Sequence, residues 1–281
     1  MSSRARILKA QKAWAASRGL RLHDGAYLDS VETNLRLPMR PSTLAAFQAG
    51  EAAELKEFPR YPAKLRALFS STALVLNVFD RWSAQEAAPL LAALDLHGAA
   101  QALQFEARFP IGADGHAPNV DLAITLDSGR VAGIESKFTE WLEPRRPAKI
   151  RFKEKYFPPG QALWTSRGLP ACQALAQELQ DGRSRYRFLY ATQLLKHALG
   201  MATQCHQGFS LVYLYYDWSG PAARAHRKEL EHFAARVGAE LDLRWLSYQE
   251  LYRRLRGSLG PEDADYLGYL AARYFPGTVE S

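Results

Sequence analysis

Hydrophobic residues in the first hundred positions recur with helical spacing, and residues typical of helix ends frame these segments. The spacing predicts helices over residues 42–55, 70–82 and 83–97. Ser83 and Glu86 have the spacing of a capping box, in which the two residues bond each other's backbone N–H groups at the start of a helix. We therefore expect a helical N-terminal region over residues 1–98.

After Gly98 the hydrophobic residues alternate with polar ones, which is typical of strands with one buried face. Three successive strands are predicted, over residues 103–109, 119–126 and 130–138. Further on we expect helices over 170–180, 186–203 and 221–237, strands over 209–216 and 241–246, and two last helices after Ser247 and Pro261. This order predicts an α/β fold in which residues 99–281 form a mixed central sheet flanked by helices, packed with the N-terminal region as one compact unit.

The segment from Asn119 to Phe138 is expected to form a β-hairpin, because two alternating runs flank the turn residues Asp127-Ser128-Gly129. A three-residue loop, with Gly129 in the left-handed region, would place Leu122 opposite Ile134. A two-residue loop would instead place Leu122 opposite Glu135. The hydrophobic pattern therefore favours the three-residue loop.

In the favoured register Asp121 lies directly opposite Glu135, and Lys137 is two residues further along the same face. Side chains paired in this way have Cβ atoms about 5 Å apart, so two carboxylates destabilise the sheet unless a cation or a proton lies between them. A hard divalent ion such as Mg²⁺ suits one or two carboxylates plus waters, which gives a metal-site hypothesis. The alternative is a solvated strand face that carries a Glu-x-Lys surface pair.

Composition narrows the classes of function. The 36 Lys and Arg against 29 Asp and Glu leave a net charge of +7, which favours a polyanionic partner, with nucleic acid and acidic lipid as candidates. Two cysteines exclude a disulfide framework and fit a reducing compartment such as the cytoplasm. The apolar runs are far shorter than the roughly 20 residues that span a bilayer, so we expect no membrane segment. The basic segment 1–23 is interpreted as an ordinary helix, with a transit peptide as the alternative.

The basic connection that follows the hairpin, residues 145–155, carries several positive charges, with Phe152 among them. Such a stretch suits contacts with phosphate groups, although a charge run is also typical of a solvated surface. The candidate nucleic-acid contacts are Arg145, Arg146, Lys149, Arg151, Lys153 and Lys155.

The hairpin resembles the PD-(D/E)XK nuclease superfamily, whose signature is a carboxylate on one strand and Glu/Asp-x-Lys on the next. The match is Asp121 followed by Glu135-Ser136-Lys137. The longer strings 118–121 and 133–137 resemble a bacterial group described as restriction endonucleases. That group also has a Ser-Ser-x-Ala-Leu helix before the sheet and a Gln-Leu-Leu-Lys-His-like helix after it, matched here by 70–74 and 193–197. Val120 stands where the superfamily name implies proline.

The resemblance implies a restriction-endonuclease-like αβββαβ core and a nuclease that hydrolyses DNA with Mg²⁺, or with Mn²⁺ as a substitute, as an endonuclease. It implies that Asp121 and Glu135 bind the metal and that Lys137 assists the attacking water. Glu106 on the preceding strand is a further candidate ligand, with a solvated strand position as the alternative. A nucleic-acid-binding module without catalysis, an RNA-processing nuclease and a carboxylate-based glycoside hydrolase stay open, as does the oligomeric state, a homodimer included.

Three polar residues share one stripe of a predicted helix, since Tyr190, Gln193 and His197 stand at positions i, i+3 and i+7. Gln193 is a candidate for positioning the water or a phosphate, and a plain polar helix face is the competing interpretation. For His197 the plain polar face is favoured.

Overall fold

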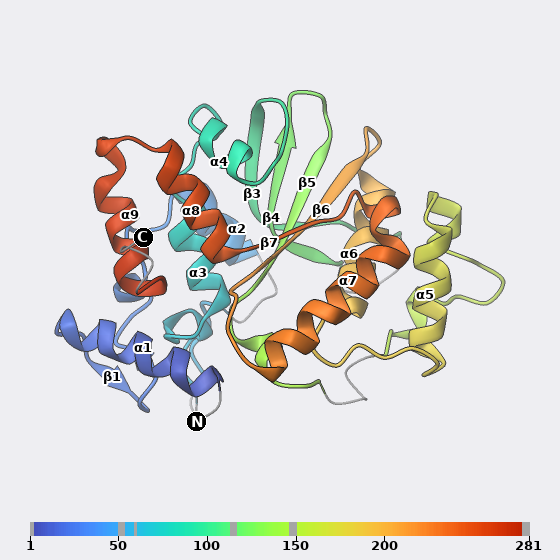
Figure 1. Ribbon diagram of the computed structural model, residues 1–281. Coiled ribbons are helices and arrows are strands. Elements are labelled where there is room, and N and C mark those ends of the chain that lie inside the picture. The colour runs from blue at the N-terminus through green and yellow to red at the C-terminus, as the bar shows by residue number, and fades with distance from the viewer. Residues whose placement is uncertain (1–2, 50–53, 59–60, 113–116, 146–150, 277–281) are drawn as a thin grey trace.

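The computed structural model describes residues 3–49, 54–58, 61–112, 117–145 and 151–276. Its centre is a five-stranded mixed sheet in the order β3-β4-β5-β6-β7 (Figure 1). The strands are β3 (Ala100–Arg108), β4 (Asn119–Leu126), β5 (Val131–Lys137), β6 (Phe209–Tyr215) and β7 (Arg244–Ser247). Neighbours from β3 to β5 are antiparallel, whereas β5, β6 and β7 are parallel. The predicted α/β class, with a mixed sheet flanked by helices, is confirmed, and the fold is restriction-endonuclease-like.

Helices cover both faces of this sheet (Figure 1). The face that carries Glu135 is covered by α6 (Ala191–Gln204) and α7 (Pro221–Leu241), with α5 (Pro170–Gln180) packed against both helices. The opposite face, which carries Ser136, is covered by α3 (Ser71–Phe79), α8 (Tyr248–Ser258) and α9 (Ala264–Tyr274). The two layers bury the sheet, so charged residues at its centre lie inside protein.

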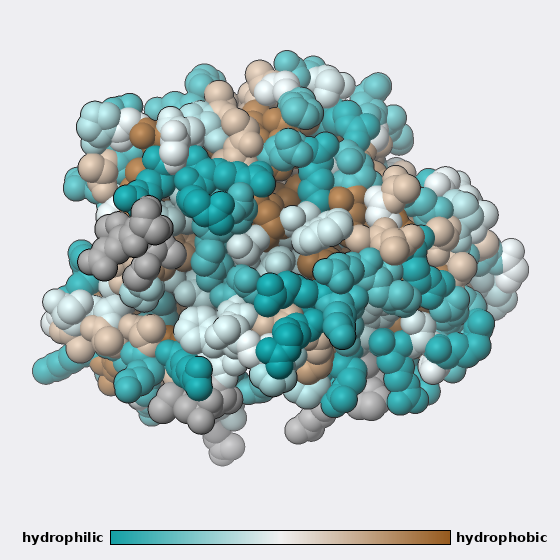
Figure 2. Space-filling model, in the orientation of Figure 1, coloured by the Kyte–Doolittle hydropathy of each residue, from teal (hydrophilic) through white to brown (hydrophobic). Residues whose placement is uncertain are grey.

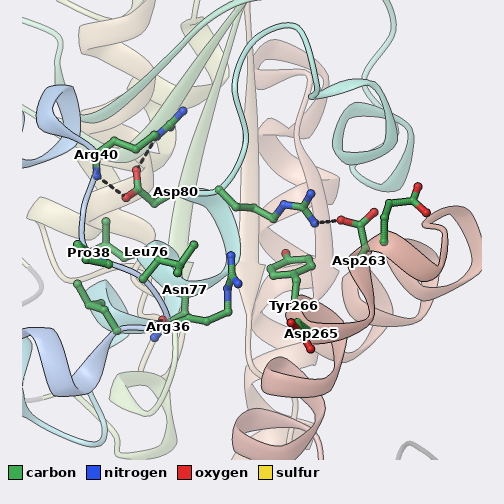
Figure 3. Close-up of a pocket in the computed structure, with 13 residues that line it drawn as sticks. Arg36, Pro38, Arg40, Leu76, Asn77, Asp80, Asp263, Asp265 and Tyr266 are labelled. Carbon is green, nitrogen blue, oxygen red and sulfur yellow. Dashed lines mark hydrogen bonds and ion pairs between the residues drawn. The ribbon is translucent and has the colours of Figure 1, made fainter.

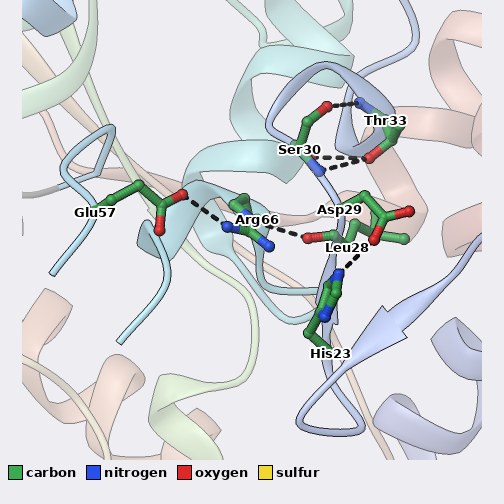
Figure 4. Close-up of polar contacts among 7 residues, drawn as sticks. All are labelled: His23, Leu28, Asp29, Ser30, Thr33, Glu57 and Arg66. Carbon is green, nitrogen blue, oxygen red and sulfur yellow. Dashed lines mark hydrogen bonds and ion pairs between the residues drawn. The ribbon is translucent and has the colours of Figure 1, made fainter. Parts of the chain in front are cut away.

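The N-terminal region contributes α1 (Ser3–Ser17), α2 (Pro41–Ala49) and α4 (Ala88–Ala93), together with a hairpin of β1 (Leu22–His23) and β2 (Tyr27–Leu28) that the sequence did not predict. Polar contacts connect segments of this region to one another (Figure 4). The guanidinium of Arg66 donates from Nε to the carbonyl of Leu28 at 2.7 Å and from a terminal nitrogen to Glu57 at 2.8 Å. One hydrophobic core contains residues from Ile7 to Phe275, and the division at residue 98 stays a prediction.

Two boundary predictions were wrong for identifiable reasons. The helix predicted from residue 186 begins at Ala191, because the carboxylate of Glu229 accepts hydrogen bonds from the backbone N–H groups of residues 187–189 and holds them outside the helix. Ser83 does not cap a helix, because its hydroxyl donates to the side chain of Glu86 at 2.7 Å and α4 starts later.

The last part of the chain follows the prediction with a shift. Leu241, predicted to begin a strand, instead ends α7, and Asp242 follows in the left-handed conformation, so β7 covers Arg244–Ser247. Half of the capping box predicted at Ser247 and Glu250 forms, since the Ser247 hydroxyl accepts from the Glu250 N–H at 3.1 Å, whereas the Glu250 carboxylate pairs with Arg253 and Arg254.

The surface in Figure 2 is mostly hydrophilic, with apolar side chains exposed only in small groups. Within the described ranges, every helix is too short or too polar to traverse a bilayer.

Candidate active site

The β4–β5 hairpin has the register that the hydrophobic pattern favoured. Leu122 pairs with Ile134, and Gly129 closes a three-residue loop with φ +79°. The paired ladder ends at Leu122 and Ile134. Asp121 and Glu135 are the next residue on each strand, and they lie close enough for the charge of Glu135 to act on Asp121. The β3–β4 ladder, which pairs Phe105 with Leu122, likewise sets Glu106 opposite Asp121. Three acids thus lie side by side on three neighbouring strands.

Glu135 is the most enclosed of the three acids, at 1% exposure. Its Oε1 forms an ion pair with the Nζ of Lys137, and its Oε2 lies 3.1 Å from the Nε2 of His197. Burial alone would raise the pKa of Glu135, but the neighbouring Lys137 and His197 lower it to about 2. Burial would lower the pKa of Lys137, yet Glu135, Glu140 and Asp121 raise it above its ordinary value. Lys137 is therefore an ammonium at neutral pH.

Asp121 is in the opposite electrostatic situation. Its Oδ2 accepts a hydrogen bond from the Ser136 N–H at 2.7 Å. Burial and the charge of Glu135 nevertheless raise the pKa of Asp121 well above its ordinary value, and Lys137 only partly offsets them. Both carboxylates can be ionised together at low cost only if more positive charge enters the site.

Glu106 extends this excess of negative charge toward the edge of the sheet. Burial, followed by the charges of Glu54 and Glu135, raises the pKa of Glu106 to about 7. Asn119 donates from Nδ2 to its Oε2 at 2.6 Å, and the backbone of Glu106 has φ +49°, in the left-handed region that non-glycine residues rarely adopt. Backbone strain of this kind is typical of functional sites, because a regular strand would not require it.

The carboxylates of Asp121 and Glu135 are hard oxygen donors, and their mutual repulsion calls for a cation. This donor set fits a Mg²⁺ ion that keeps several water ligands. Among the described residues, no group of three or more His, Cys, Asp and Glu side chains forms a complete metal site. Any ion here would therefore rely on water for most of its coordination.

His197 lies against Glu135, so the interpretation of a plain polar helix face was wrong. Its side chain is 3% exposed and faces Glu135 because α6 approaches β5 closely. A Cβ on Gly133 would lie 2.6 Å from the sulfur of Met201, and a Cβ on Gly200 would lie 2.4 Å from the carbonyl oxygen of Phe109. Gly133 on the Glu135 face was the sequence signal that could have identified this contact.

Gln193 and Tyr190, which share the predicted helix stripe with His197, flank the acids. Gln193 is half-buried on α6, one turn before His197, and its side chain makes no hydrogen bond within the described part of the chain. The ring of Tyr190, which precedes the helix, lies between two cations: Lys137 Nζ is 4.9 Å and the Arg145 guanidinium carbon 4.2 Å from its centroid. The ring therefore links the acid cluster to the basic connection.

Only part of the basic connection can be placed, because Arg146 and Lys149 lie outside the described residues. Arg151 and Lys153 are exposed, and Lys155 is half-buried. Phe152 and Tyr156 are buried against Trp164, with ring centroids 5.5 and 6.1 Å away. These rings anchor the connection and are not available for stacking on bases.

A cavity of about 440 Å³ lies elsewhere, between the segment 35–40, α3 and the start of α9 (Figure 3). Two ion pairs lie in its lining: Arg40 pairs with Asp80 at 3.1 Å, and Arg81 pairs with Asp263. Glu106, Asp121 and Glu135 do not line this cavity. It is therefore a polar contact region between helices and is separate from the candidate site.

Comparison with known proteins gives one match. A family model described as "Restriction Endonuclease associating with ARP" matches residues 8–275, a range that includes the whole sheet and α6. No curated protein and no solved structure matches the chain.

Proposed function

The chain belongs to the family of restriction endonucleases associating with ARP, and from this membership we propose that it is a Mg²⁺-dependent endonuclease that hydrolyses the phosphodiester bonds of DNA. The observation that carries the proposal is the proximity of half-buried Asp121 on β4 to buried Glu135 on β5, with the Lys137 ammonium against Glu135. The net charge of +7 and the basic connection support a polyanionic substrate.

Asp121 and Glu135 would hold Mg²⁺, or Mn²⁺ in its place, with Glu106 as a further ligand or as an acceptor for a metal-bound water. The ion supplies Lewis acidity toward the scissile phosphate and lowers the pKa of bound water. The raised pKa of Asp121 supports this role, because a divalent cation would offset the repulsion that the apo site cannot.

Lys137 would act as a charge and hydrogen-bond donor. Because its pKa is raised, it stays an ammonium and cannot accept a proton from water at neutral pH. Its chemistry is therefore to stabilise the negative charge that develops on the phosphate and to orient the attacking water. Gln193, whose side chain makes no hydrogen bond within the described chain, would orient the same water or a phosphate oxygen.

His197 would position Glu135. Its Nε2 lies 3.1 Å from Glu135 Oε2, close enough for an ion pair when the ring is protonated, and neither ring nitrogen has a well-aligned hydrogen bond among the described residues. By holding one oxygen of Glu135 it fixes the direction in which the carboxylate presents the other.

The test is cleavage of supercoiled plasmid by the purified protein with Mg²⁺, Mn²⁺ or EDTA. We expect nicking with either metal and none in EDTA, and loss of cutting in Asp121→Ala, Glu135→Ala and Lys137→Ala. Asp127→Asn, an exposed acid in the loop of the same hairpin, is the matched control and should cut normally. Undiminished cutting by all three alanine variants, or by the wild type in EDTA, would overturn the proposal. An RNA duplex assayed in parallel separates a DNA enzyme from an RNA-processing one.

A second candidate is a DNA-binding module of the same fold without catalysis. It is favoured by the lack of a complete metal cluster among the described residues and by the ion pairing of Glu135 with Lys137. It predicts that the protein binds DNA with the same affinity with and without Mg²⁺ and never cuts. The two free cysteines, Cys172 and Cys205, fit a cytoplasmic location for either candidate.

A further inference from the structure

One turn of α6 connects the acid site with the basic connection. His197 points inward to Glu135, whereas the neighbouring Lys196 is half-buried on the side of the basic connection. The Nζ of Lys196 lies 5.9 Å from the ring centroid of Phe152 and 5.7 Å from that of Tyr156. The flexible side chain is thus held against two aromatic rings instead of extending into water.

Lys196 has no anionic partner in the described chain. The acid in the adjoining segment, Glu154, is exposed, and no carboxylate forms an ion pair with Lys196 among the residues that the structure places. Most lysines stay solvated or pair with an acid when they are buried. Partial burial without a carboxylate is therefore a cost that a bound anion would offset.

Other cations converge on the same place. Arg145 is held by Thr192, whose Oγ1 accepts at 3.2 Å one turn before Lys196 on α6. Lys153 and Lys155 follow and precede the two rings that Lys196 touches. Burial, followed by the charges of Arg145, Lys153 and Lys155, lowers the pKa of Lys196. Four like charges held together favour a polyanion over a single small counterion.

This cluster is continuous with the candidate active site. From Lys137 the path runs across the ring of Tyr190 to Arg145, then along α6 from Thr192 to Lys196. A strand of nucleic acid with one phosphate at Lys137 would bring neighbouring phosphates along this path.

We propose that Lys196 binds a backbone phosphate of the substrate strand next to the scissile phosphate, as the central residue of a phosphate-binding cluster with Arg145 and Lys153. The inference rests on the proposed nuclease function and adds a binding residue from α6. The aromatic rings of Phe152 and Tyr156 set its position, so the contact is with the backbone and independent of base sequence.

The test compares Lys196→Met with Lys196→Arg, and with Lys228→Met as a matched control that removes an exposed lysine from α7. Binding of a labelled DNA duplex is measured by fluorescence anisotropy in EDTA, so that no variant cuts, over a series of salt concentrations. Loss of one phosphate contact should flatten the plot of log K against log salt by about 0.9 and weaken binding about eightfold near 0.1 M salt. Lys196→Arg should keep the wild-type slope, and Lys228→Met should match the wild type.

Two results would overturn the inference. One is a Lys196→Met variant with the affinity and slope of Lys228→Met. The other comes from measuring the binding of polyglutamate in the same way. A Lys196→Met variant that loses affinity for polyglutamate but not for DNA would make the ligand an acidic protein. If Lys196→Met does not fold, as judged by its thermal melting, Lys196→Gln takes its place and the same two results apply.

The outcome also separates this inference from the proposed function. A wild type that cuts plasmid with Mg²⁺ while Lys196→Met binds normally would contradict the phosphate contact and leave the nuclease intact. A wild type that never cuts while Lys196→Met loses salt-sensitive binding would contradict the nuclease and support the contact.

Discussion

Arg273 and Lys196 are both cations drawn out of solvent, but their surroundings differ. Where α1 meets α9, Arg273 is 1% exposed, and its guanidinium donates to the carbonyl and side-chain oxygens of Asn34, to the Tyr269 hydroxyl and to Gln11. On α6, Lys196 lies against the rings of Phe152 and Tyr156, and no carboxylate among the described residues forms an ion pair with it. The first cation is saturated by neutral acceptors, whereas the second is left for a ligand.

The same contrast separates His197 and His226, the buried histidines of the described residues. His226 is stacked on Trp141 and bonded to the Tyr213 hydroxyl at 2.8 Å, and burial lowers its pKa to about 3. His197 faces a carboxylate on the site side of α6. A buried polar group set among neutral neighbours serves the fold, whereas one set against an excess of charge indicates a site.

The largest effect we expect is on activity. Glu135→Gln keeps the volume of the side chain but removes its charge, so cutting should fall by about a thousandfold or more, the scale of losing a central electrostatic group. Rates of plasmid cleavage in Mg²⁺ measure it, with Asp127→Asn as the control that keeps its rate. A loss of less than about tenfold would show that Glu135 is no metal ligand.

The next largest effect is on stability, in the region around Arg273. Arg273→Met leaves the side-chain oxygens of Asn34 and Gln11 without the Arg273 donor, and the free energy of unfolding should fall by about 3–5 kcal/mol. Urea denaturation measures it. Arg224→Met, at an exposed position of α7, should change the value by no more than about 0.5 kcal/mol. Equal values for the two variants would refute the structural role of Arg273.

A smaller effect depends on pH. Because His226 has a lower pKa in the folded protein than in the unfolded chain, only the unfolded chain gains its proton as the pH falls from about 6.5 toward 3. The folded state should therefore lose about 2 kcal/mol from this residue between pH 8 and pH 5. Urea denaturation of the wild type and His226→Gln at both pH values isolates this contribution, and parallel pH profiles would contradict it.

The smallest effect is a gain of stability. Asp121→Asn removes the charge that burial and Glu135 oppose, while its side-chain oxygen can still accept from the Ser136 N–H. We expect no cutting but a free energy of unfolding about 1 kcal/mol higher than that of the wild type, a trade of stability for function. An Asp121→Asn variant less stable than the wild type would show that the carboxylate stabilises the apo fold.

The features that the sequence predicted well are local ones. The register of the β4–β5 hairpin followed from Gly129 and from alternation on its two arms. The two strands of the β1–β2 hairpin, with two residues each, are too short to show any period. A charged side chain on another element, as Glu229 is for residues 187–189, can move a helix start without any local signal.

The candidate site likewise contains residues that the sequence could group together and residues that it could not. Asp121, Glu135 and Lys137 could be grouped by strand register alone, because they lie on one hairpin. His197 could not be grouped with them, since its place depends on how closely α6 approaches β5 at Gly133 and approaches Phe109, after β3, at Gly200. The burial of Phe152 and Tyr156 likewise depends on Trp164, which no local pattern connects to the basic segment.

The most direct test of the central claim is the rate of plasmid cleavage as a function of Mg²⁺ concentration, for the wild type and Asp121→Ala. If two aligned carboxylates gather a divalent ion, the wild-type rate rises from zero in EDTA to a plateau, and the variant stays at zero at every concentration. A rate that does not depend on the metal, or equal curves for the two proteins, would contradict the account.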